Sequence, residues 1–124
     1  MKRIFSAFIL SLLFFISCKK NETEPPVVTI FSPAANDSFY VADSVRIIFS
    51  VNDKNLNAYK IIISNSYTRK IYYKEETAVD ANNITIDKRI LVSINADTTV
   101  LLNVLGIDKN GNTGSAGVSF KFKK

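Results

Sequence analysis

The segment Ser44–Asn52 alternates apolar and polar side chains, and this pattern constrains the fold more than any other feature. The apolar residues occupy every second position from Val45 to Val51, and only Ile48 interrupts the polar set. Successive side chains of a strand point to opposite faces, whereas a helix repeats its apolar positions every three or four residues. The segment therefore predicts a β-strand with one buried face.

Six further short runs are rich in Val, Ile, Thr, Phe and Tyr and are bounded by Asn, Asp, Ser, Gly or Pro, as strands are. They cover Val27–Phe31, Leu56–Ser64, Arg69–Glu75, Asn83–Val92, Thr99–Asp108 and Gly117–Lys123. The run at residues 99–108 is apolar on both faces, which is typical of a central strand. No stretch after Val27 has a convincing helical period. Residues 27–124 are thus predicted to form an all-β domain, a seven-stranded antiparallel sandwich.

Cys18 is the only cysteine of the chain, and it follows a hydrophobic N-terminal segment. Lys2 and Arg3 precede residues 4–16, which are mostly apolar but too few for a spanning helix of about 20 residues. This is the pattern of an export signal. A single cysteine cannot form an intrachain disulfide, and the chain has no histidine to share a metal with a thiol.

The segment Phe15-Ile16-Ser17-Cys18 resembles a bacterial lipobox, although that motif prefers Leu where Phe15 stands. The resemblance implies cleavage before Cys18 and a covalent lipid on that residue, with two or three acyl chains anchoring the protein stably. We predict a lipoprotein signal peptide over residues 1–17 and a lipidated tether over 18–26. In a conventional secretory peptide, Cys18 would have no such role. The expected location is the bacterial outer membrane, facing the periplasm or the outside, with no cofactor besides the lipid.

The positive charge of the chain is smaller in the processed protein. Removal of Lys2 and Arg3 leaves 14 basic and 11 acidic residues, a net charge of about +3. Solvated lysines on a sheet surface account for this excess. Nucleic acid is not an expected partner, because an exported chain does not meet it and no aromatic–basic platform is evident. Anionic envelope glycans or lipid head groups are compatible with the charge.

Asp108-Lys109-Asn110-Gly111-Asn112 separates two predicted strands, and Asn52-Asp53 separates two others. With Ser32-Pro33 after the first strand, these segments resemble bacterial immunoglobulin-like and fibronectin-type-III-like domains over residues 27–123. The resemblance implies Greek-key connections. It is particularly close to small Gram-negative lipoproteins whose single immunoglobulin-like domain has no assigned function. The histidines and the Gly-x-Tyr of those relatives are missing here, so the resemblance implies no metal or ligand role.

The turn at Asp108, Asn110 and Asn112 has two interpretations. Asp and Asn side chains cap turns, and Gly111 can adopt a positive φ, so turn capping explains the composition. Alternatively, the three side chains could bind calcium together with Asp53 and Asn55, which should lie at the same end. Gly111 stands at the wrong position for an EF-hand loop, and no Glu follows at the twelfth position. Turn capping is preferred, and no metal site is predicted.

Phe39 and Tyr40 are candidate contacts for a partner. The segment Ala34–Asp43 should lie with the loop around Asn65–Thr68 at the end of the sandwich that points away from the tether. Aromatic side chains on exposed loops can stack on glycans or contact proteins. Alternatively, the two rings close the end of the sandwich.

The predicted sixth strand suggests a second partner surface. If Val100, Leu102 and Val104 face the core, their neighbours must face outward, and Ile62 on the adjacent strand should join them. These four outward residues could form an apolar patch for a partner or a second copy, or a neighbouring segment could cover them. The candidate residues are Ile62, Leu101, Leu105 and Ile107.

Catalysis is not expected, because the chain has no histidine, nucleophile motif or phosphate-binding loop. Glu75 and Glu76 are adjacent, so a strand would turn them to opposite faces. The sequence therefore predicts a lipid-anchored cell-envelope protein with a non-catalytic immunoglobulin-like module that binds a glycan or a protein. An accessory or structural subunit of an outer-membrane complex is the alternative.

Overall fold

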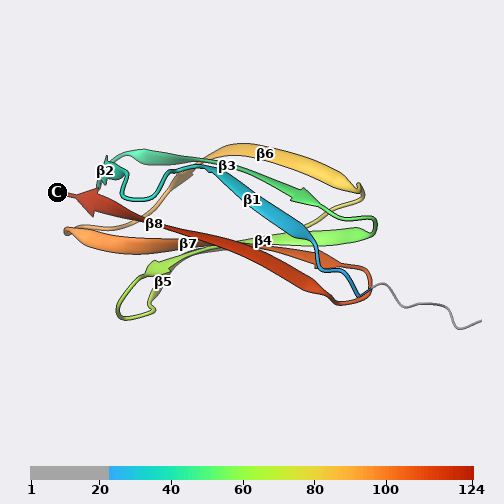
Figure 1. Ribbon diagram of the computed structural model, residues 1–124. Coiled ribbons are helices and arrows are strands. Elements are labelled where there is room, and N and C mark those ends of the chain that lie inside the picture. The colour runs from blue at the N-terminus through green and yellow to red at the C-terminus, as the bar shows by residue number, and fades with distance from the viewer. Residues whose placement is uncertain (1–22) are drawn as a thin grey trace, which may run out of the picture.

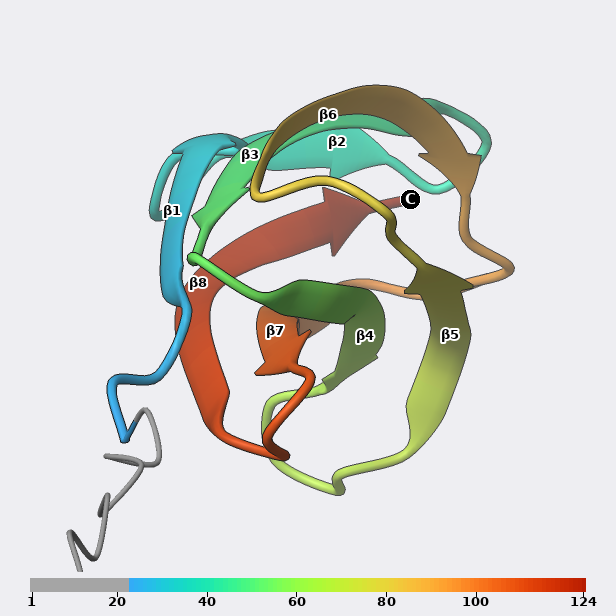
Figure 2. The ribbon, with the colours of Figure 1, turned by 90° about the vertical axis from the view of Figure 1, so that its right-hand side faces the viewer.

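The computed structural model describes residues 23–124, which form two β-sheets packed face to face (Figures 1 and 2). The predicted signal peptide and Cys18 lie outside the described residues. Within this range no helix occurs, so none is long and apolar enough to cross a membrane. The strands are β1 (Val27–Ser32), β2 (Ser38–Tyr40), β3 (Ser44–Asn52), β4 (Leu56–Asn65), β5 (Ile71–Ala78), β6 (Asn83–Leu91), β7 (Thr98–Asp108) and β8 (Thr113–Lys123).

One sheet has the strand order β1-β3-β6 and the other β2-β8-β7-β4-β5. The chain crosses between the sheets from β3 to β4, from β5 to β6 and from β6 to β7, which gives Greek-key connections. In Figure 2, β1 lies beside β8 on one side of the sandwich, and β5 and β6 lie on the other. The predicted all-β sandwich is therefore confirmed.

The predicted strand number was wrong, because the structure has eight strands. The additional strand is β2, and it pairs in parallel with β8, so the sandwich is not wholly antiparallel. After β1 the chain turns at Asn36, whose φ is 66°, and the three residues of β2 then lie along the edge of the other sheet. Three residues are too few to show an alternating pattern, and for this reason the sequence did not reveal β2.

Three predicted boundaries also needed correction. The first is the end of β5, which runs to Ala78 rather than Glu75, because its pairing with β4 continues to Ala58 opposite Ala78. β8 begins at Thr113 rather than Gly117, because the small residues before Gly117 pair with β7, with Ser115 opposite Leu105. β5 begins at Ile71 rather than Arg69, because Arg69 has a φ of 65° and belongs to the turn after β4.

The core lies between the two sheets and follows the predicted alternation. The inward residues of β3 from Val45 to Val51 are 0% exposed, as are Val100, Leu102 and Val104 of β7. On the outward face of β3, Arg46 pairs with Asp87 of β6, with 2.6 Å between a guanidinium nitrogen and a carboxylate oxygen. The largest fully buried side chains are Phe49, Phe120, Phe122, Ile47, Leu56, Ile61, Ile63, Leu102, Val45, Val51, Val92 and Val100.

Two glycines fix where the described chain enters the sandwich. Pro26 is buried beneath β7 and β8, where a Cβ on Gly114 would lie 1.8 Å from the Pro26 carbonyl oxygen. A Cβ on Gly106 would lie 2.8 Å from the Pro26 Cβ. We call this end, where β1 starts, the entry end. The distal end is the opposite one, which holds the β4–β5 loop, the start of β7 and the end of β8 (Figure 1).

Candidate functional site

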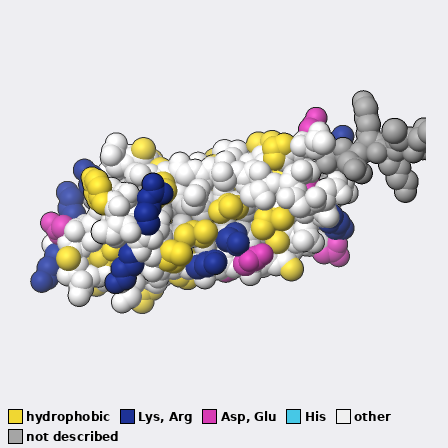
Figure 3. Space-filling view, turned by 90° about the horizontal axis from the view of Figure 1, so that it is seen from below, with side chains coloured by type: hydrophobic (Ala, Val, Ile, Leu, Met, Phe, Trp, Pro, Cys, Tyr) yellow, Lys and Arg dark blue, Asp and Glu magenta, His cyan; other side chains and the backbone are white. Residues whose placement is uncertain are grey.

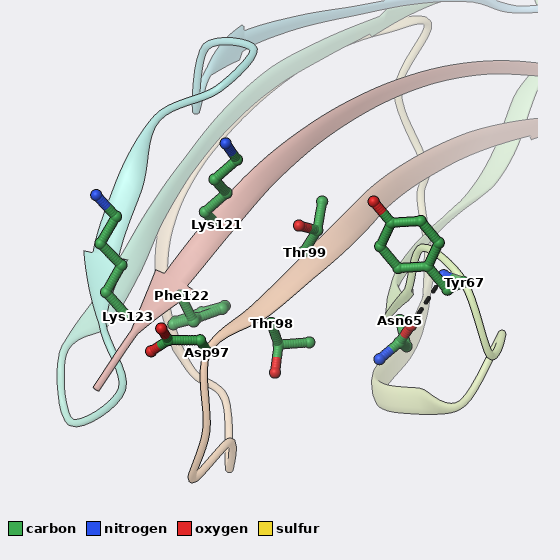
Figure 4. A pocket seen from close by; sticks show the side chains of 8 residues that line it. All are labelled: Asn65, Tyr67, Asp97, Thr98, Thr99, Lys121, Phe122 and Lys123. Atoms are coloured by element: carbon green, nitrogen blue, oxygen red, sulfur yellow. Dashed lines mark hydrogen bonds between the residues drawn. The ribbon is translucent and has the colours of Figure 1, made fainter.

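A hollow of about 310 Å³ opens at the distal end, and we call it the distal hollow (Figure 4). Its walls come from the β4–β5 loop on one side and the end of β8 on the other, with the start of β7 between them. Its volume is at the small end of the range of about 300–1,000 Å³ that is usual for ligand sites. The lining residues are Asn65, Tyr67, Asp97, Thr98, Thr99, Lys121, Phe122 and Lys123.

The β4–β5 loop presents Tyr67 to the hollow. The Asn65 side-chain oxygen accepts hydrogen bonds from the backbone N–H of Tyr67, at 2.8 Å, and of Thr68, at 2.9 Å. Such a local bond is a common way for Asn to fix a turn. The turn closes because the N–H of Arg69 donates to the Asn65 carbonyl oxygen at 3.1 Å. Tyr67 itself is 83% exposed, so an ordered backbone carries a solvent-facing aromatic ring.

The opposite wall consists of two lysines on β8. Lys121 and Lys123 both point outward, because the alternate residues Phe120 and Phe122 fill the core. Thr99 lies opposite Lys121 in the strand register. Its hydroxyl has no hydrogen-bond partner among residues 23–124. Asp97, just before β7, is joined to the end of the chain, because its carboxylate accepts a hydrogen bond from the backbone N–H of Lys124 at 2.8 Å.

The distal end is rich in positive charge. Figure 3 shows Lys and Arg side chains gathered at the left-hand end of the molecule, which is the distal end in this view. Three exposed acidic residues, Asp37, Asp43 and Asp97, belong to the same end. The basic side chains there are Arg69, Lys70, Lys121, Lys123 and Lys124.

Phe39 and Tyr40, the candidate partner contacts that could instead close the end of the sandwich, lie in β2 rather than on a loop. The Phe39 ring meets the Phe120 ring edge-on, with 5.5 Å between their centroids, and also contacts Phe122. Tyr40 points the other way and is 67% exposed. The structure therefore separates the pair: Phe39 closes the end of the core, and Tyr40 faces solvent outside the distal hollow.

The four outward residues of the predicted patch lie on one face of the five-stranded sheet, and we call them the outer apolar strip. All are half-buried, whereas their inward neighbours in β7 are fully buried. Ile62 lies opposite Asn103, between the positions of Leu101 and Leu105. Figure 3 shows apolar side chains crossing this face beside charged ones.

At the entry end, Asp108 is buried and holds its own turn together. Its carboxylate accepts the N–H groups of Asn110, at 2.9 Å, and Asn112, at 2.8 Å, and also the Asn112 side-chain amide at 2.8 Å. Gly111 has a φ of 84°. Burial acts to raise the pKa of Asp108, but these hydrogen bonds, with that of Gly111, outweigh it and keep the pKa below its usual value.

Asp53 lies in the neighbouring loop, which meets the Asp108 turn where the N–H of Lys109 donates to the Asn55 carbonyl oxygen at 2.8 Å. The Asp53 carboxylate accepts the N–H of Asn55 at 3.0 Å. Each carboxylate thus caps its own loop. In the described part of the chain, no group of three or more His, Cys, Asp or Glu could hold a metal ion.

Solved structures share this arrangement of strands. Fibronectin(III)-like modules of CbhA from Clostridium thermocellum align with 78% of this chain and 96% of their own, at 18% identity and a TM-score of 0.52. The chain has an immunoglobulin- and fibronectin-III-like sandwich fold.

Two other structures align less closely. A superoxide reductase (neelaredoxin) from Ignicoccus hospitalis covers 84% of both chains, at 10% identity and a TM-score of 0.50. CopC from Methylosinus trichosporium OB3b covers 78% of this chain and 94% of its own, at 12% identity and a TM-score of 0.49. No family model and no curated protein matches the sequence. At such identities the likeness concerns the fold alone.

The sequence did not identify Tyr67 and the two lysines opposite it as candidate site residues of this fibronectin-III-like fold. The sequence predicts the loop at residues 65–68 at the correct end, but it points to Phe39 and Tyr40 as the aromatic contacts there. The missed indication was Asn65, because Asn followed by Ser-Tyr-Thr has the composition of a tight turn, and this turn carries Tyr67.

Proposed function

We propose that this chain is a lipid-anchored, non-catalytic binding module of the cell envelope and that its binding site for a glycan is the distal hollow. One observation carries the proposal: an exposed tyrosine on a hydrogen-bonded turn faces polar side chains across a hollow at the end opposite the chain entry. Aromatic rings with a polar edge suit ligands that have both apolar and hydroxyl faces.

The position of the hollow fits a tethered protein. The described chain enters at the end opposite the hollow, and the Cys18 that we predict to be lipidated lies a few residues before that entry. A tether of eight or nine residues reaches about 30 Å when extended. A second hollow of about 310 Å³ lies at the entry end, next to Glu24 and Asp53, and would face the membrane. The distal hollow would face away from it, in the periplasm or outside the outer membrane.

Lipid anchoring is tested by the variant Cys18→Ser in the native host. We expect the variant to appear in the soluble fraction, or unprocessed, while the unchanged protein stays with the outer membrane. Membrane association of the variant that survives a high-salt wash would contradict a lipid anchor.

Glycan binding is tested on a glycan array with the full-length protein in mild detergent. Tyr67→Ala should weaken binding more than about tenfold, as truncation of a central aromatic contact does. Tyr40→Ala is the matched control, because Tyr40 is also an exposed tyrosine but lies outside the hollow. Equal loss in both variants, or in neither, would contradict this site.

The outer apolar strip favours a second function, that of an accessory or structural subunit of an outer-membrane complex. Its four side chains stand half-buried on the face of the five-stranded sheet that is turned away from the core. A stoichiometric partner crosslinked in the native envelope and lost with Leu105→Lys would support this function. Retention of the partner in that variant would count against it.

A further inference from the structure

We propose that the distal hollow selects an acidic saccharide, with Tyr67 against the sugar ring and Lys121 and Lys123 on its carboxylate. This inference rests on the proposed function and adds the charge class of the ligand. Figure 4 shows the tyrosine ring on one side of the opening and the two lysines on the other, so a single ligand in the hollow lies between them.

The first argument is uncompensated positive charge. Neither lysine forms an ion pair with any residue of the described range 23–124, in contrast to Lys60 and Lys88, which pair with Glu76 and Glu75. Lys121 and Lys123 lie two positions apart on one strand, so they share a face at about 7 Å spacing. Two like charges at this spacing attract an anion that can lie between or across them.

The second argument is the surrounding field. The exposed residues Arg69, Lys70 and Lys124 belong to the same end. Together with the two lysines of the hollow they outnumber the acidic residues there, which are Asp37, Asp43 and Asp97. Among the described residues, Asp97 is the only acidic one that lines the hollow, and one of its oxygens already accepts the N–H of Lys124. A cleft in which one sign of charge dominates concentrates ligands of the opposite sign.

The third argument distinguishes a saccharide from other polyanions. The hollow combines an aromatic ring on an ordered turn with the Thr99 hydroxyl, which lies between the ring and Lys121 and has no partner within residues 23–124 (Figure 4). Its volume of about 310 Å³ admits one ring or a chain end. A stable protein interface needs about 800 Å² per partner, which argues against a protein as the occupant of so small a hollow. A polyanion held by charge alone would need neither the ring nor the hydroxyl.

The test compares each acidic polymer with its own neutral ester. The full-length protein in mild detergent is titrated calorimetrically with polygalacturonate, alginate and hyaluronan, and then with the methyl ester of each. Polyglutamate serves as an acidic polymer without sugar rings. We expect at least one acidic polysaccharide to bind, its ester to bind at least about tenfold more weakly, and polyglutamate not to compete.

Variants test whether the lysines and the tyrosine of the distal hollow cause the preference for an acid over its ester. Lys121→Gln with Lys123→Gln should weaken acid binding about tenfold or more and abolish the difference between acid and ester. Tyr67→Ala should weaken binding of both forms. Lys54→Gln with Lys109→Gln is the matched control, because it removes the same charge from exposed positions at the entry end. The control should bind as the unchanged protein does.

Each failure has a distinct meaning. Equal binding of acid and ester that is lost in Tyr67→Ala overturns the charge selection but leaves the glycan-binding function standing. If polyglutamate binds as tightly as the polysaccharides do, the hollow recognises negative charge alone, and the proposal that its ligand is a saccharide is overturned. If no acidic polysaccharide and no neutral glycan of the array binds, both this inference and the proposed function are overturned.

Discussion

The Lys88 ammonium nitrogen lies 2.5 Å from a carboxylate oxygen of Glu75, so an ion pair joins the two sheets at their β5–β6 side. The hydroxyls of Tyr73 and Thr77 also donate to this carboxylate, at 2.7 and 3.0 Å. Glu76 points to the opposite face, as the alternation predicted, and it pairs there with Lys60. Both β5 and β6 are edge strands, and inward-pointing charges on edge strands hinder pairing with another chain.

Removing the cation of this pair should destabilise the protein. Lys88→Met keeps most of the stem but leaves the Glu75 carboxylate, whose side chain is only 23% exposed, without its cation. We expect a loss of about 1–3 kcal/mol in the free energy of unfolding, measured with urea. Lys74→Met, on an exposed position of the adjacent strand β5, is the control and should change little. Equal stability of the two variants would show that the pair contributes nothing.

The same pair predicts how stability depends on pH. The hydrogen bond from Lys88, followed by that from Tyr73, holds the pKa of Glu75 below its usual value. A carboxyl with a lowered folded-state pKa stabilises the fold above its unfolded value of about 4.3, and this is lost as the pH falls through the folded pKa. The pKa of Lys88 is raised by its hydrogen bond to Glu75, so its contribution is present below about pH 10.4 and lost as the pH rises through the folded pKa.

Urea unfolding across the pH range checks both the loss of stability in acid and the loss of stability in alkali. The unchanged protein should be most stable between them, and Lys88→Met should have a shallower alkaline decline. Part of that decline remains in the variant, because burial, followed by the hydrogen bond to Glu75, raises the pKa of Tyr73, so ionisation of this phenol in alkali also destabilises the fold. If the free energy of unfolding declined equally in alkali in both proteins, the contribution assigned to Lys88 would be refuted.

The sequence predicted the strands that have an alternating apolar pattern, but it did not predict which residues the tertiary structure brings together. β3 was predicted at its observed bounds, Ser44–Asn52, because nine alternating residues define a strand and its buried face. The partners Glu75 and Lys88 were not predicted, because they lie in different sheets and no strand register links them. The distal hollow was missed for a related reason: Tyr67 and Lys121 lie in one sheet, but on elements that are far apart in the sequence and separated by β7, so they come together only once that sheet is assembled.

Gly114 should tolerate no side chain. A Cβ there would lie 1.8 Å from the Pro26 carbonyl oxygen, so Gly114→Ala must displace the backbone at the chain entry. We expect a loss of about 1–3 kcal/mol in the free energy of unfolding, as overpacking causes. Gly117→Ala in the same strand is the control, because its Cβ would have no neighbour closer than 3.5 Å. Comparable losses in both variants would mean that strand propensity, not the Pro26 contact, decides the effect.

Asp108 should act as a capping carboxylate whose contribution depends on pH. Because hydrogen bonds keep its pKa low despite burial, its contribution is present above the unfolded value of about 3.9 and lost as the pH falls through the folded pKa. Asp108→Asn should lower the midpoint urea concentration at neutral pH and reduce the decline in acid. Asp80→Asn, at an exposed position, is the control. A neutral-pH midpoint unchanged by Asp108→Asn would remove the capping role.

The outer apolar strip should accept charge without loss of the fold. Leu105 is half-buried on the outward face, whereas Leu102 is 0% exposed in the core of the same strand. Leu105→Lys can extend its ammonium group into water while its stem lies on the sheet, so we expect less than about 1 kcal/mol of lost stability. Leu102→Lys must bury the charge and should unfold the protein, because an unpaired buried charge is costly. Circular dichroism with urea unfolding separates the two, and collapse of Leu105→Lys would show that this face belongs to the core and offers no partner surface.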